Sequence, residues 1–167
     1  IELLHLFKQL PELPQKKRER FHIQYGFSHA DAYSLTRDYN LASYSEHVMS
    51  ELMEWLESMQ QISEIHDSRL PKLAANWLLN DLAALVKSEW EKNPVSAENF
   101  AEFVSLIAKN KISSKAAKQV LAIMVSTRRD PSDIIASEQL EQVGESEELV
   151  AIVTAVIKNH PQALEDY

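Results

Sequence analysis

The sequence predicts an all-α protein, a helical bundle followed by a small helical tail module. Three observations predict this fold class. The 167 residues include only two glycines, the six prolines lie mostly at the edges of segments, and apolar residues recur at spacings of three and four. This spacing gathers apolar side chains on one face of a helix, because a helix makes one turn in about 3.6 residues.

The first three helices have recognisable start and stop signals. Residues 14–26 form the first, since Pro14 is tolerated at a helix start and Gly26 readily adopts the left-handed conformation that ends a helix. Ser28 opens the second, with Asp31 three residues further on to complete the cap. Residues 40–59 form a long amphipathic helix, whose apolar stripe consists of Leu41, Tyr44, Val48, Leu52, Trp55, Leu56 and Met59.

Residues 71–90 predict a helix that is apolar on most sides and therefore central in the bundle. Polar side chains on such a helix need partners, and we expect hydrogen bonds to other helices or domains for Asn76, Asn80 and Asp81. Asn93-Pro94 then interrupts the chain. Ser96 opens the next helix, which Asn110 closes in the left-handed conformation.

A module boundary is expected near Asn110, giving a helical domain at 1–110 and the start of a tail domain at 111–167. The tail is predicted to hold three helices, which open at Ser113/Ser114, at Asp130-Pro131 and at Ser146. Each carries apolar residues at helical spacing after its opening residue, so each has a face to bury.

Composition excludes several classes of function. With Gly26 and Gly144 as the only glycines, the Gly-rich loops that bind nucleotide phosphates are absent from this sequence. Cysteine is absent too, which fits a cytoplasmic protein and removes thiol chemistry. No apolar run approaches the roughly 20 residues of a membrane span. The chain begins at Ile1 without a basic and apolar leader, so we expect a fragment of a longer protein.

A basic stretch at residues 109–129 is the candidate binding site. The formal charge of the chain is −8, yet this stretch contains no Asp or Glu and six cations: Lys109, Lys111, Lys115, Lys118, Arg128 and Arg129. On a helix that starts at Ser114, Lys115 and Lys118 project away from the apolar stripe, which leaves both ammonium groups free for phosphates. The alternative is an ordinary solvated helix face.

Other candidates are weaker. A second basic cluster, Lys16, Lys17, Arg18 and Arg20, is more simply solvated surface or a contact with a preceding domain. The helical spacing of Tyr44, Trp55, Trp77, Phe100 and Phe103 favours core packing over base stacking. His47 and Glu51 lie four residues apart without a third ligand, so no metal site is expected. No catalytic residues are expected either.

Several strings resemble one family in order and spacing, the B subunits of bacterial glutamyl/aspartyl-tRNA amidotransferases. They include LPELP at 10–14, Asp31-Ala32 with Leu35-Thr36, Leu41-Ala42 with Tyr44, KLAANWLLNDL at 72–82, KISSKAAK at 111–118, Asp130-Pro131 and the segment 159–167. Of these, KLAANWLLNDL is the most specific. The resemblance extends over essentially the whole chain. It implies the C-terminal helical domain followed by a YqeY-like tail domain, truncated at its C-terminus.

The resemblance also implies a function. In this family an N-terminal domain, which would precede Ile1, uses ATP and Mg²⁺ to activate the side-chain carboxylate of misacylated Glu-tRNA(Gln) or Asp-tRNA(Asn). An A subunit releases ammonia from glutamine, a C subunit braces the heterotrimer, and the helical and tail domains of the B subunit hold the tRNA. The chain itself is then a tRNA-binding, non-catalytic region without a cofactor of its own. The alternative is a helical adaptor that binds proteins and makes no direct RNA contact.

The chain departs from the family pattern at three glycine positions. Family members usually have Gly at the position of Asn110, a Gly-containing loop at residues 126–129, and Gly-Leu where this chain has Gln139-Leu140. The family tail also normally continues past Tyr167 into a basic segment.

Overall fold

A computed structural model describes residues 12–58 and 69–141 of the chain, and these residues are all-helical, with no strand among them. The predicted fold class is therefore confirmed. The helices in chain order are α2 (Pro14–Tyr25), α3 (His29–Thr36), α4 (Tyr39–Ser58), α6 (Arg69–Asn76), the π-helical turn η1 (Trp77–Leu82), α7 (Ala83–Leu85), the 3₁₀ turn η2 (Trp90–Lys92), α8 (Ala97–Ala108), α9 (Ser114–Thr127) and α10 (Pro131–Glu138).

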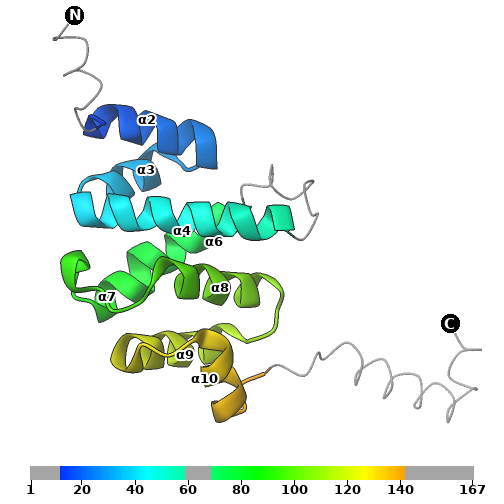
Figure 1. The fold of residues 1–167 in the computed structure, drawn as a ribbon. Helices are drawn as coiled ribbons and strands as arrows, with labels where there is room; N and C mark the ends of the chain where they lie inside the picture. The colour runs from blue at the N-terminus through cyan, green and yellow to red at the C-terminus, as the bar shows by residue number, and fades with distance from the viewer. Residues whose placement is uncertain (1–11, 59–68, 142–167) are drawn as a thin grey trace, which may run out of the picture.

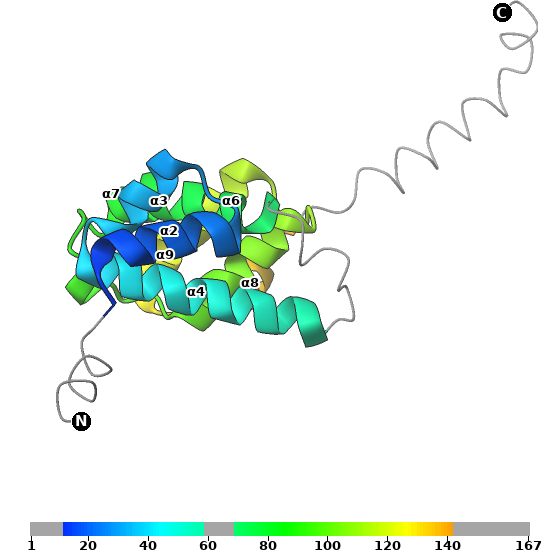
Figure 2. The ribbon, with the colours of Figure 1, turned by 90° about the horizontal axis from the view of Figure 1, so that it is seen from above.

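The helices stack in layers, which Figures 1 and 2 show from two directions. In Figure 1, α2 and α3 lie at one end, α4 crosses beneath them, and α6, α7 and α8 follow. The pair α9 and α10 forms the opposite end. The most extensive helix contact joins α4 to α8, so these two helices form the centre of the stack.

The predicted helix starts are confirmed at four positions. Ser28, Ser96 and Ser113 each accept a hydrogen bond from the backbone N–H three residues on, at 3.0, 3.1 and 3.2 Å. Asp130 caps α10 by accepting from the N–H of Ser132 at 2.8 Å and of Asp133 at 3.3 Å. These bonds satisfy N–H groups that lack a partner within the helix.

The left-handed helix stops predicted at Gly26 (φ 67°) and Asn110 (φ 54°) are confirmed. The same conformation occurs at Arg128 (φ 60°) and Gln139 (φ 54°), which follow α9 and α10. These last two and Asn110 fall at the positions for which the resemblance implies glycine or a glycine-containing loop. Non-glycine residues therefore adopt a conformation that costs a side chain roughly 1–2 kcal/mol.

The single helix predicted at 71–90 is wrong in its details. It begins earlier, at Arg69, widens into the π-helical turn η1, and ends at Leu85. Lys87 and Ser88 are both left-handed, and the chain then forms a separate 3₁₀ turn that starts at Trp90. The buried Trp90 ring packs 6.1 Å from the Tyr44 ring, so packing against α4 prevails over continuation of the helix.

One hydrophobic core runs through the described helices, from Phe21 in α2 to Ile135 in α10. Trp77, Phe100 and Phe103 are buried in it as predicted, whereas Tyr44 and Trp55 are half-buried. Trp77 and Phe103 meet edge to face, with their ring centroids 5.2 Å apart. The boundary expected near Asn110 falls between α8 and α9 and stays a prediction, as does the helix expected from Ser146, which lies outside the described residues.

Candidate nucleic-acid interface

The basic stretch comprises α9 and the loops at its two ends. The helix buries Ala117, Val120, Leu121 and Met124 against the core, which leaves its opposite face in solvent. Lys115 and Lys118 lie on this exposed face, as the sequence predicted. No acidic residue occurs on α9, so the face presents cations and small or uncharged side chains to the solvent.

Three of the six cations are held by other parts of the chain. The Lys109 ammonium lies 4.2 Å from the centre of the Trp55 ring on α4. Arg129 Nη2 donates to Ser137 Oγ at 3.1 Å and to the Asp133 carbonyl at 3.4 Å, both on α10. Lys118 Nζ lies 3.2 Å from Asp81 Oδ1 on η1. The expectation that the Lys118 ammonium is free is therefore wrong.

The other three cations are Lys111, Lys115 and Arg128, all exposed. Within the described part of the chain, none of their side chains has a hydrogen-bonding or ion-pair partner. Lys111 and Lys115 lie at the N-terminal end of α9, and Arg128 lies just past its C-terminal end. Because α9 has 14 residues, the two ends are about 20 Å apart. The open cations therefore form two groups, one at each end of α9.

A small hollow of about 350 Å³ adjoins Lys115, between the first turns of α9 and the end of α10. Ser113 and Gln119 line it together with Glu141. The hollow thus contains one carboxylate beside one ammonium group, and its lining does not select for an anion.

The polar residues Asn76, Asn80 and Asp81 have different surroundings. Asn76 and Asn80 are both exposed, and Asn80 Nδ2 donates to Asn76 Oδ1 at 2.6 Å within the same helical run, so the expected bond to another helix is not what pairs them, while bonding to another domain stays a prediction. Asp81 does contact a separate element, through its ion pair with Lys118 on α9. Asp81 therefore connects the KLAANWLLNDL string to the basic stretch.

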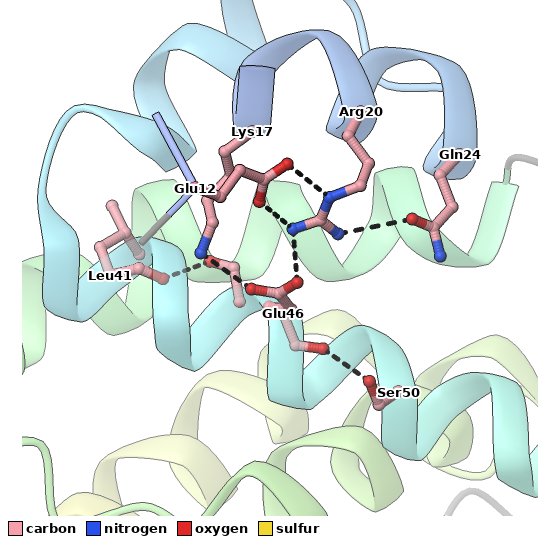
Figure 3. A network of polar contacts seen from close by, with 8 residues as sticks. Glu12, Lys17, Arg20, Gln24, Leu41, Glu46 and Ser50 are labelled. Atoms are coloured by element: carbon pink, nitrogen blue, oxygen red, sulfur yellow. Dashed lines mark hydrogen bonds and ion pairs between the residues drawn. The ribbon is translucent and has the colours of Figure 1, made fainter. Parts of the chain in front are cut away.

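The second basic cluster lies at the far end of the stack, and two of its cations bind acids of this chain (Figure 3). Arg20 donates twice to Glu12, from Nε at 2.9 Å and from Nη2 at 2.6 Å, and Nη2 also lies 2.5 Å from Glu46 Oε1. Lys17 Nζ donates to Glu46 Oε2 at 2.9 Å. We call these four residues the α2–α4 clamp. Its cations stabilise a helix contact and are already paired with acids of this chain.

The clamp shifts the titration of its acids. The hydrogen bond from Arg20 holds the pKa of Glu12 below its usual value. At Glu46, partial burial acts to raise the pKa, but hydrogen bonds from Lys17 and Arg20 outweigh it, and the pKa is lowered. Both carboxylates are therefore more stable in the folded chain than in the unfolded chain.

An acidic hollow between α4 and α8 was not anticipated from the sequence. It has a volume of about 420 Å³ and is lined by Glu51, Glu54, Trp55, Glu98, Ala101 and Glu102. Partial burial, with Asp130 nearby, raises the pKa of Glu102, which accepts a hydrogen bond from the Ser132 hydroxyl. The glutamates lie three or four residues apart on each helix, and this spacing is visible in the sequence. The sequence does not show that the two acidic faces meet, because that depends on how α4 packs against α8.

The described residues contain no group of three or more His, Cys, Asp or Glu side chains placed to hold a metal ion. None of their helices combines the length and the apolar character that a membrane span requires.

The comparison with known proteins matches this chain to one family. The model of the GatB domain matches residues 57–167. The aspartyl/glutamyl-tRNA(Asn/Gln) amidotransferase B subunits of Clostridium beijerinckii and Fusobacterium nucleatum are 34% and 32% identical to it. These matches cover 96% and 99% of this chain but 31% and 32% of the relatives. The Coxiella burnetii protein of the same name is 35% identical over 95% of the chain.

The chain thus spans about a third of the length of these relatives. The GatB domain model covers well over half of the chain, including η1, α8, α9 and α10. The chain belongs to the GatB domain family and corresponds to the C-terminal region of the amidotransferase B subunits.

Proposed function

We propose that this chain is a tRNA-binding region of an aspartyl/glutamyl-tRNA amidotransferase, and that the exposed cations along α9 contact the tRNA backbone. The observation that carries the proposal is the acid-free basic stretch on an otherwise acidic member of this family. An acidic protein is not attracted to RNA as a whole, so binding requires a local cationic surface of this kind. Lys111, Lys115 and Arg128 are the residues best placed to supply it.

The contacts we propose are to phosphates. Such contacts position a nucleic acid without reading its bases, which suits a region that grips the shape of a tRNA. We propose that the reaction itself takes place elsewhere, in parts of the B subunit that bind ATP and Mg²⁺ and in an A subunit that supplies ammonia, with a C subunit completing the complex. The setting we propose is the cytoplasm.

A salt titration of tRNA binding tests the proposal. The double variant Lys111→Ala/Lys115→Ala should weaken binding and lower the slope of log affinity against log salt by about 1.5, since each phosphate contact contributes about 0.7 to 0.9. The matched control is Lys72→Ala/Lys87→Ala, which removes the same charge from exposed positions outside the basic stretch. An equal loss in both variants would reduce the effect to net charge and contradict the proposed interface.

The protein-adaptor alternative predicts a different result. In that case the chain binds the other amidotransferase subunits but shows no salt-dependent affinity for tRNA(Asn) or tRNA(Gln). Measuring both interactions on the same preparation separates the two functions.

A further inference from the structure

Asp81 occupies an unusual place for an ionised side chain. It lies in the π-helical turn η1, on a run that buries Leu78 and Leu82 completely. Its side chain is 21% exposed, so the carboxylate is partly removed from water. A partly buried carboxylate requires a compensating cation or hydrogen-bond donors. Wide helical turns of this kind occur frequently at functional positions.

The cation that compensates Asp81 comes from the basic stretch. Lys118 Nζ lies 3.2 Å from Asp81 Oδ1, and the lysine side chain is still 67% exposed. Lys115, one turn earlier on α9, is also exposed and lines the hollow that contains Glu141, but it has no ion pair within the described residues. Of these two lysines on one helix face, Lys118 is therefore the one held in an ion pair, by the acid on η1.

We infer that Asp81 sequesters Lys118 and so determines which cations of the α9 face bind phosphates. The inference rests on the proposed function. A phosphate that approaches Lys118 meets the negative charge of Asp81, which already neutralises the ammonium group. Exposed ion pairs of this type change an equilibrium constant by a factor of about 1.5 to 5. Lys118 should therefore contribute less to tRNA affinity than Lys115, by about this factor.

The test is a double-mutant cycle on tRNA binding by the whole chain. Asp81→Asn keeps the shape of the side chain and removes its charge. It should raise affinity about 1.5- to 5-fold at low salt and steepen the salt slope by about 0.7 to 0.9, the contribution of one new contact. Lys118→Ala should have little effect in the unmodified chain and should abolish the gain in the Asp81→Asn background. Lys115→Ala is the matched control and should weaken binding in both backgrounds.

A second measurement does not depend on RNA or on the Asp81 variant folding well. In the unmodified chain, acetic anhydride should modify the Lys118 amine more slowly than the Lys115 amine, as followed by mass spectrometry of the digested protein. Equal rates for the two amines would overturn the sequestration of Lys118.

The binding outcomes separate the two claims. If the chain binds tRNA and Lys118→Ala weakens binding as much as Lys115→Ala, the inference is overturned and the proposed function stands. The inference is also overturned, and the proposed function stands, if an Asp81→Asn variant folds and binds tRNA with unchanged affinity. If no variant binds tRNA, the proposed function is overturned, and the role of Asp81 in RNA binding with it.

Discussion

Neutralising Glu46 should destabilise the fold through the α2–α4 clamp. Glu46 accepts from Lys17 at 2.9 Å and from Arg20 at 2.5 Å, and these are the contacts that join α2 to α4 in Figure 3. Glu46→Gln keeps the size of the side chain and removes its charge. Arg20 then retains Glu12, whereas Lys17 loses its acid partner although its side chain is only 17% exposed.

The burial of the clamp sets the expected magnitude. Fully exposed ion pairs are worth about 0.2–1 kcal/mol, while removing one partner of a buried pair costs about 3–5 kcal/mol. The clamp side chains are 17–32% exposed and lie between these limits. We therefore expect Glu46→Gln to lower the free energy of unfolding by about 1–2 kcal/mol at neutral pH. For a chain of this size the melting temperature should fall by about 3–6 °C.

The effect should depend on pH. The pKa values of Glu12 and Glu46 are lowered from 4.5 in the folded chain, so the clamp contributes its full stability above pH 4.5. This stability is lost as the pH falls through the lowered folded-state values, because protonation removes the charges that the cations bind. The difference between Glu46→Gln and the unmodified chain should therefore shrink on acidification.

Thermal unfolding followed by circular dichroism measures both effects. Glu54→Gln is the matched control, since Glu54 is an exposed residue of the same helix and has no ion pair within the described part of the chain. The reasoning is refuted if Glu46→Gln and Glu54→Gln melt at the same temperature at neutral pH. It is also refuted if their difference persists unchanged at acidic pH.

Glu102→Gln should raise the melting temperature at neutral pH, because burial raises the pKa of Glu102 above 4.5 and the folded chain favours its neutral form. The stability linked to the Glu102 carboxyl group is present below pH 4.5 and is lost as the pH rises through its folded-state pKa. The melting temperatures of Glu102→Gln and the unmodified chain should therefore converge in acid. A difference that stays constant with pH would contradict this prediction. Arg128→Gly should raise the free energy of unfolding by up to about 1 kcal/mol, since glycine relieves the left-handed strain, while weakening the proposed tRNA contact. Denaturant unfolding measures the change in stability, and a salt titration of tRNA binding measures the lost contact. A less stable Arg128→Gly variant would contradict the claim that the left-handed Arg128 is strained.

The outline of the fold could be predicted because its signals are local. A cap such as Ser113 bonds to an N–H only three residues away, and a left-handed stop such as Asn110 depends on its own backbone angles. The burial of Val120 and Leu121 follows from helical spacing in the same way. The sequence by itself therefore determined the fold class and the position of the basic stretch. It also determined where the helices that open at Ser96, Ser113 and Asp130 begin.

Tertiary structure decided which of the candidate cations are open. Lys17 binds Glu46, 29 residues away, and Lys118 binds Asp81 on a different element. The early end of α7 has the same origin, because the chain leaves the helix after Leu85 and Trp90 then packs beside Tyr44. Such partners are brought together by the packing of one helix on another, and no spacing along a single helix encodes them. The charge of the basic stretch was readable in the sequence, but its division into held and open cations arises from the packing of α9 against the rest of the bundle.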